Sequence, residues 1–345
     1  MRIVIKIGTN LLTENLCGLR TEFIRHIAEQ ISKLKKQGNE ILIVTSGAIG
    51  AGCTELGIKK SREIETRQAL AAVGQSVVMG AYKEAFSRYK ITVAQILLTY
   101  EDFSNRKRYL NLKKAINRLL DLNVIPIINE NDPISVDEIG TTFGDNDKLS
   151  ALVASKVGAD HLIMLTDVDG LYDKNPKTNK DAKLIRIVEN ITKDIENAAG
   201  KSGSMFSIGG MITKIKAAKI AMDSGCNIII CNGKKKDILE KALKNQEGTL
   251  FVTKGKLAEK QRWIKFSKAK GKIIVNECAK DILLKGKSSL LAVGIEKVEG
   301  NFKKDDIVEI NDIAKGIADH SSEEIKRLIG KKGKIIIKHE NIVML

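Results

Sequence analysis

The sequence predicts an α/β protein, a three-layer sandwich around a mostly parallel sheet, followed by a small, mostly β C-terminal domain. Continuous apolar runs alternate with helical patterns as far as about residue 253. Such alternation is typical of a parallel sheet covered by helices on both faces. Beyond residue 270 the apolar runs become short and the long helical patterns end.

The first helix is expected to begin with Thr21 as its N-cap and to stop at Gly38, because apolar residues recur between them at helical spacing. Further helices are expected over 63–86 and 104–122. The buried strands of the sheet are expected over 2–7, 40–44, 91–98, 124–128, 160–166, 226–230 and 249–252.

The character of the chain changes after Phe251. The stretch from Lys254 to Arg262 is polar and lysine-rich, which predicts a connector ending at Trp263, the only tryptophan. Beyond it we expect short strands over 272–275, 291–295, 306–310, 334–338 and 341–344, with short helices over 277–285 and 321–328. The predicted organisation is therefore a first domain over 1–257, a linker over 258–270 and a second domain over 271–345.

The composition indicates an ordinary soluble protein, with 43% hydrophobic and 29% charged residues. No signal peptide, no bilayer-spanning run and no C-x-x-C pair is expected, so we place the chain in the cytoplasm, without a membrane partner or a structural zinc site. The net charge of +16 is spread along the chain, and only 12 of the 58 basic residues are arginine. This charge is weak support for an RNA partner but suits acidic small-molecule substrates.

Three loops favour the binding of a polyphosphate. The first apolar run contains Lys6 and ends at a turn at Gly8. The second apolar run is followed by Ser46 and by three glycines over 47–52. The third loop, 207–214, has two glycines before a helix whose first turn carries a lysine. Each loop alone also fits a snorkelling lysine or a glycine turn. The spacings match neither a P-loop nor the dinucleotide fingerprint.

Carboxylate and amide side chains are concentrated in three further segments. These are Asn129–Asp132, which follows a strand, Gly144–Asp147, which leads into a helix, and Thr166–Asp167, which ends another strand. Helix capping explains part of the second segment, and a turn at Asp169–Gly170 explains part of the third. Together they suit a small ligand that carries both an amino and a carboxyl group.

These segments, in this order, resemble the glutamate 5-kinases of the amino acid kinase family, and the resemblance covers essentially the whole chain. The tail resembles the PUA domain. The kinase motifs are Lys6–Thr9, Thr45–Ile49, Ala71–Gln75, Asn129–Asp132, Phe143–Asp147 and Gly209–Met211, and those of the tail are Ser288–Leu291, Gly300–Phe302 and Ser321–Glu324.

The resemblance implies an amino acid kinase fold and the ATP-dependent phosphorylation of the side-chain carboxylate of L-glutamate, the first step of proline biosynthesis. Lys6 and Lys214 would flank the transferring phosphoryl group, and Asp147 would orient them. Glutamate would be bound by Ser46, Asp132 and Asn146. The residues that would hold ATP are Lys6, Gly8, Thr166, Asp167, Ile208, Gly209, Gly210, Met211, Ile212, Thr213 and Lys214.

The expected cofactor is ATP with Mg²⁺, and because no metal cage is visible the ion is expected on the phosphates and water. Proline is the expected feedback inhibitor, and a homo-oligomer, a dimer or tetramer, is expected. Few arginines and aromatics stand in the tail, so RNA binding by the PUA-like domain is not expected.

The sequence departs from the family at two places. Ser207-Ile208 stands where the family has Gly-Thr, and the hairpin between Ile310 and Lys315 is short. Two alternatives stay open: a sister kinase acting on acetylglutamate, aspartate or a nucleoside monophosphate, and an RNA-binding regulator that retains a kinase-like body.

Overall fold

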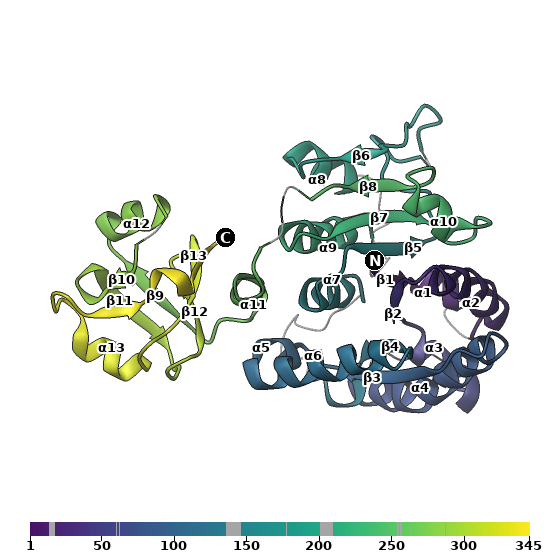
Figure 1. Ribbon diagram of the computed structural model, residues 1–345, viewed down its shortest axis with the longest axis horizontal. Helices are drawn as coiled ribbons and strands as arrows, with labels where there is room; N and C mark the ends of the chain where they lie inside the picture. Colours follow the sequence, from purple (N-terminus) through teal and green to yellow (C-terminus); the bar gives the residue numbers. More distant parts are fainter. Residues whose placement is uncertain are drawn as a thin grey trace. The chain divides into compact units, whose positions relative to one another are not determined.

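The chain folds into two compact units, Met1–Asp102 with Arg106–Lys256, and Phe103–Asn105 with Leu257–Leu345 (Figure 1). The structure is a computed structural model. It describes residues 1–13, 18–59, 61, 63–135, 146–176, 178–200, 210–253, 255, 257–286 and 288–345.

The first unit is built on an eight-stranded sheet with the order β3-β4-β2-β1-β5-β7-β8-β6. All neighbouring strands are parallel except β7 and β8, which are antiparallel. The predicted mostly parallel sheet is therefore confirmed. The strands are β1 (Arg2–Ile7), β2 (Glu40–Val44), β3 (Val93–Leu98), β4 (Ile125–Glu130), β5 (His161–Thr166), β6 (Ile187–Val188), β7 (Asn227–Asn232) and β8 (Thr249–Phe251).

Helices cover both faces of this sheet, which confirms the three layers (Figure 1). Ile3, Ile5 and Ile7 share one apolar core with residues of α2, α4 and α10. Side chains alternate along a strand, so Lys6 faces the other side, where α7 packs on β1 and α9 packs on α7. The helices are α1 (Thr9–Leu12), α2 (Thr21–Lys36), α3 (Ala48–Leu56), α4 (Ile64–Ser87), α5 (Tyr100–Ser104), α6 (Arg106–Asp121), η1 (Asp132–Ile134), α7 (Asn146–Val157), α8 (Lys193–Gly200), α9 (Met211–Asp223) and α10 (Ile238–Leu243).

Two glycines let α3 and α4 approach backbone to backbone. A Cβ atom on Gly52 would lie 1.9 Å from the carbonyl oxygen of Leu70, and one on Gly74 would lie 1.8 Å from that of Ala48. No side chain fits at such distances, so glycine is required at both positions. The contact fixes the start of α3, and with it the loop that follows β2.

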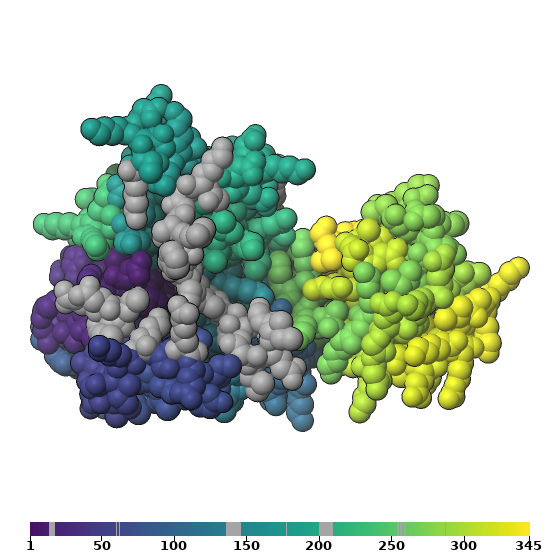
Figure 2. Space-filling view, turned by 180° about the vertical axis from the view of Figure 1, so that it is seen from behind, coloured from purple at the N-terminus to yellow at the C-terminus, as the bar shows by residue number. Residues whose placement is uncertain are grey.

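The second unit has its own apolar core and a five-stranded sheet with the order β11-β9-β12-β13-β15, beside a β10-β14 pair. The space-filling view shows this unit as a body formed almost entirely by the C-terminal segments (Figure 2). Its elements are α11 (Glu259–Phe266), β9 (Gly271–Val275), α12 (Glu277–Leu284), β10 (Leu290–Leu291), η2 (Ala292–Gly294), β11 (Ile295–Gly300), β12 (Ile307–Ile310), β13 (Ala314–Ile317), α13 (Ser322–Leu328), β14 (Ile335–Ile337), η3 (His339–Asn341) and β15 (Ile342–Met344).

Three local expectations were wrong. Thr21 is the first helical residue of α2 rather than its cap, which is Arg20 without a side-chain hydrogen bond. The expected polar connector contains the helix α11, whose Arg262 and Trp263 are buried. The expected strand over 291–295 is the 3₁₀ turn η2 between two strands. No helix in the described part of the chain is long and apolar enough to cross a membrane.

Candidate active site

The candidate residues gather at the carboxyl ends of the central strands. Lys6, Ser46, Asn129 and Thr166 stand at or just beyond the ends of β1, β2, β4 and β5, which are adjacent in the sheet. Strand β1 marks a topological switch point, because β2 lies on one side of it and β5 on the other. Ligands of open α/β sheets bind at such a point.

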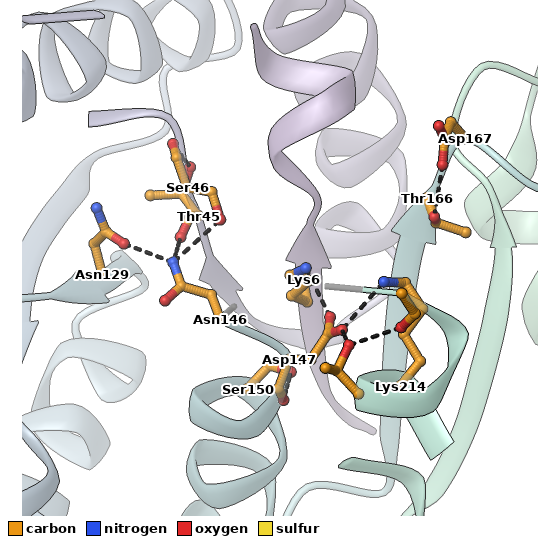
Figure 3. Close-up of polar contacts among 12 residues, drawn as sticks. Lys6, Thr45, Ser46, Asn129, Asn146, Asp147, Ser150, Thr166, Asp167 and Lys214 are labelled. Atoms are coloured by element: carbon orange, nitrogen blue, oxygen red, sulfur yellow. Dashed lines mark hydrogen bonds and ion pairs between the residues drawn. The ribbon is translucent and has the colours of Figure 1, made fainter. Parts of the chain in front are cut away.

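Asp147 stands between two lysines from distant parts of the chain (Figure 3). Its Oδ1 lies 2.7 Å from Lys6 Nζ, and its Oδ2 lies 3.1 Å from Lys214 Nζ. Thr213 Oγ1 donates a hydrogen bond of 2.8 Å to the same Oδ2. Lys6, Asp147 and Lys214 are buried, with exposures of 1%, 0% and 6%. One carboxylate therefore holds two ammonium groups at defined positions.

The local structure explains why these three groups meet. Lys6 is fixed in β1, where it pairs in register with Val44 of β2 and Met164 of β5. Asp147 is the second residue of α7, and Lys214 is in the first turn of α9. Because α7 packs on both β1 and α9, the carboxylate bridges the sheet and the neighbouring helix. Two ammonium groups fixed this close together suit an anionic ligand.

Asn146 points to a second cluster, at the ends of β2 and β4 (Figure 3). Its Nδ2 donates to the carbonyl oxygen of Thr45, to Ser46 Oγ at 3.1 Å and to Asn129 Oδ1 at 2.8 Å. Asn129 Nδ2 donates in turn to Gln75 Oε1 at 2.8 Å. Successive residues of a helix point about 100° apart, so Asn146 and Asp147 reach two different clusters of side chains.

Thr166 and Asp167 form a third group, at the end of β5. Thr166 Oγ1 donates to Asp167 Oδ1 and Asn10 Nδ2 donates to Asp167 Oδ2, both at 3.2 Å. Burial alone would raise the pKa of Asp167, but these hydrogen bonds and the charge of Lys214 outweigh it and lower the pKa. Asp167 is therefore ionised at neutral pH.

The turn at Gly8, predicted as part of a polyphosphate-binding loop, uses its own N–H within the sheet. Gly8 N–H donates to the carbonyl oxygen of Leu165 at 3.1 Å, because the β1–β5 ladder continues by one residue. An added Cβ at this position would lie 3.2 Å from that oxygen, a tight contact, and 3.9 Å from Lys6 Nζ.

Asp132 begins the 3₁₀ turn after β4 and is half-buried. Burial raises its pKa to about 6, and the positive charge of Arg67 opposes this shift in part. Its carboxylate therefore changes charge close to neutral pH. No contact joins Asp132 to Ser46 or Asn146 among the described residues.

The structure thus brings together Lys6, Asp147 and Lys214 in one group and Ser46 with Asn146 in another. Gly210, Met211, Ile212 and Thr213 form the N-cap and first turn of α9. Ile208, Gly209 and the Gly144–Asp145 pair lie outside the described residues. Two members of the Asn146 cluster, Thr45 and Gln75, were missed as functional residues. Their motifs were visible, but Thr45 acts through its backbone and Gln75 lies inside a long helix.

The described residues contain no group of three His, Cys, Asp or Glu side chains that could hold a metal ion. A Mg²⁺ ion carried by nucleotide phosphates and water would need few protein ligands, so it would not require such a group.

Comparison with known proteins agrees with this architecture. Residues 1–232 match the amino acid kinase family and residues 271–339 match the PUA domain. A glutamate 5-kinase from Methanosarcina barkeri is 51% identical, over 95% of this chain and 89% of that protein. One from Geobacter metallireducens is 43% identical, over 100% of this chain and 97% of that protein.

Solved structures share the fold of the first unit. Carbamate kinase from Giardia lamblia bound to AMP-PNP matches with a TM-score of 0.54 at 16% identity, over 73% of this chain and 98% of that chain. Isopentenyl phosphate kinase from T. acidophilum matches with a TM-score of 0.52 at 20% identity, over 73% of this chain and 100% of that chain. With a full-length match to curated relatives and both domains in place, the chain belongs to the amino acid kinase family, in the branch of the glutamate 5-kinases with a C-terminal PUA domain.

Proposed function

We propose that this protein is a glutamate 5-kinase, which transfers the γ-phosphoryl group of ATP to the side-chain carboxylate of L-glutamate and forms glutamyl 5-phosphate, the first step of proline biosynthesis. The observation that carries the proposal is the buried Asp147 carboxylate between Lys6 and Lys214. Two fixed ammonium groups beside the ends of parallel strands suit the transfer of a phosphoryl group.

The mechanism follows from the charges of the reactants. A carboxylate is already a nucleophile at neutral pH, so no general base is required. The obstacle is the repulsion between this anion and the phosphates of ATP. Lys6 and Lys214 would flank the transferring group and neutralise its charge, and Asp147 would keep both in place.

The two substrates would lie on either side of this centre. Ser46, Asn146 and Asp132 would bind glutamate at the ends of β2 and β4. Thr166 and Asp167 would hold ATP at the end of β5, together with Gly8 and the segment 208–214. Mg²⁺ would be carried by the phosphates and water and would supply further charge neutralisation.

An ADP-release assay with a panel of acceptors tests the proposal. L-Glutamate should stimulate ADP release far more than aspartate, acetylglutamate or a nucleoside monophosphate. Preference for one of the other acceptors would assign the chain to a sister kinase. A folded protein that binds RNA and releases no ADP with any acceptor would support the regulator alternative.

Proline should inhibit at the glutamate site, because it presents the same α-carboxylate and amine without the reactive side chain. Inhibition that a higher glutamate concentration does not relieve would contradict a shared site.

We further propose a homo-oligomeric enzyme of the cytoplasm. Within the described part of the chain, Cys231 and Cys278 are thiols outside any disulfide, which suits a reducing compartment.

A further inference from the structure

We propose that Gln75 of α4 is a positioning residue for the acceptor substrate, because it orients Asn129 and so supports the carbonyl of Thr45 in fixing which atom of the Asn146 amide faces the site. The inference rests on the proposed function, since it takes Asn146 as a residue that binds the amino acid. The three side chains are 8%, 3% and 9% exposed, respectively. They form a buried row of amides joined by hydrogen bonds of 2.8 Å.

The direction of this row is set at its Thr45 end. A backbone carbonyl only accepts, so the group of Asn146 that faces Thr45 must be its Nδ2. The same Nδ2 donates to Asn129 Oδ1, which turns Asn129 Nδ2 toward Gln75. Gln75 closes the row with an oxygen. An acceptor at position 75 and the carbonyl of Thr45 thus impose the same orientation on both asparagines.

This orientation presents an acceptor to the substrate. Nδ2 of Asn146 is occupied by protein partners, whereas its Oδ1 has no hydrogen-bond partner within the described residues. An amide oxygen that is oriented by the protein and left for a ligand suits a donor, such as the α-ammonium of an amino acid. Ser46 Oγ accepts from Asn146 and keeps its own proton available for an acceptor such as a carboxylate.

Gln75 lies beside the point where its helix meets α3 in backbone contact. The preceding residue, Gly74, is the point where α4 meets α3, with an added Cβ only 2.4 Å from Gly52 N. Gln75 Nε2 is itself buried without a hydrogen-bond partner among the described residues. The amide is therefore oriented by its oxygen, at the cost of an unsatisfied donor.

Two substitutions separate positioning from packing. Gln75→Met removes the acceptor at similar volume, so Asn129 can turn its NH₂ group toward Asn146 and weaken the hold on the Asn146 amide. We expect the glutamate KM to rise roughly tenfold or more, with kcat and the ATP KM changed less than about threefold. Gln75→Glu keeps an oxygen toward Asn129, so the glutamate KM should stay within about threefold of wild type. Its buried carboxyl group should nevertheless lower Tm more than Met does.

The order of the two variants in glutamate KM distinguishes the two roles. If Gln75 only packs, Gln75→Glu should be the more damaged enzyme in every assay. A second readout uses glutarate, which is glutamate without its amino group. Gln75→Met should lose much of the preference for glutamate over glutarate that the wild type shows. The control is Ser76→Ala at the exposed neighbour, whose hydroxyl bonds only within α4.

The inference is overturned if Gln75→Met keeps the wild-type glutamate KM and preference, or if Gln75→Glu raises KM as much as Gln75→Met. A wild-type enzyme that releases ADP with another acceptor refutes the proposed function instead. In that case the same two variants must differ in KM for that acceptor, or the inference falls as well.

Discussion

The central prediction concerns Asp147→Asn, which removes the charge that holds both lysines. The change keeps the size of the side chain, but an amide must turn its NH₂ group toward one of its three donors. Each ion pair, at 2.7 and 3.1 Å, is worth about 5–6 kcal/mol at an effective dielectric constant near 20. Removing one partner of a buried pair costs about 3–5 kcal/mol in practice.

If that loss is expressed in the transition state, kcat falls about a hundredfold to several thousandfold, because about 1.4 kcal/mol corresponds to a factor of ten. Initial rates of glutamate-dependent ADP release at saturating substrates measure this. The matched control is Asp312→Asn, which removes the same charge from an exposed pair with Lys272 and should leave kcat within about twofold. Asp147→Asn with normal kcat and only a lower Tm would mean that Asp147 merely stabilises the start of α7, and our reasoning would be wrong.

Four further outcomes are expected. Lys6→Met and Lys214→Met should each lower kcat far more than they change the glutamate KM, and near-normal kcat in both would remove the mechanism. Asp132 titrates near pH 6 when folded, above its ordinary 3.8, so ionising it costs stability that is lost as pH rises from about 4 to 6, at most about 3 kcal/mol. Asp132→Asn should therefore raise Tm at pH 8 while weakening glutamate binding, and a thermal scan with KM measured at pH 5.5 and 8 checks both. Gly74→Ala should destabilise the protein by several kcal/mol in urea titrations, because its Cβ would meet backbone, whereas Gly80→Ala, with open space around it, should not. A chain ending at Gly255 should keep glutamate-dependent ADP release, and its loss in a protein still folded by circular dichroism would contradict a self-sufficient kinase unit.

The parallel sheet was predictable because its strands are buried on both faces and read as unbroken apolar runs. Strand β2, Glu40–Val44, matches its expected bounds for this reason. The edge strand β6 has only two residues, and its pairing with β8 depends on tertiary contacts that no local pattern encodes. The helix α11 was missed because its residues are mostly polar and its few apolar side chains are buried against its own unit.

The candidate site was predictable where a residue stands out in its surroundings. Lys6 is a charge inside a buried strand, and Asn146 and Asp147 follow a glycine in a run of polar residues. Gln75 lies in the family motif Ala71–Gln75, but nothing local marks its side chain, because glutamine inside a long helix is ordinary. Its role depends on the close approach of α3 and α4, which only the three-dimensional structure reveals.

The pairing of Lys6 with Asp147 and Lys214 also constrains how the chain can fold. Lys6 belongs to a central strand made at the start of synthesis, whereas its counterion follows some 140 residues later and the second lysine later still. An intermediate that closed the first four strands alone would bury an uncompensated ammonium group, which costs several kcal/mol. We therefore expect the early half of the sheet to stay open until α7 docks, with a folding nucleus that joins segments distant in the chain. On this argument the buried Lys6–Asp147 pair would delay the burial of β1 until the whole kinase unit is present.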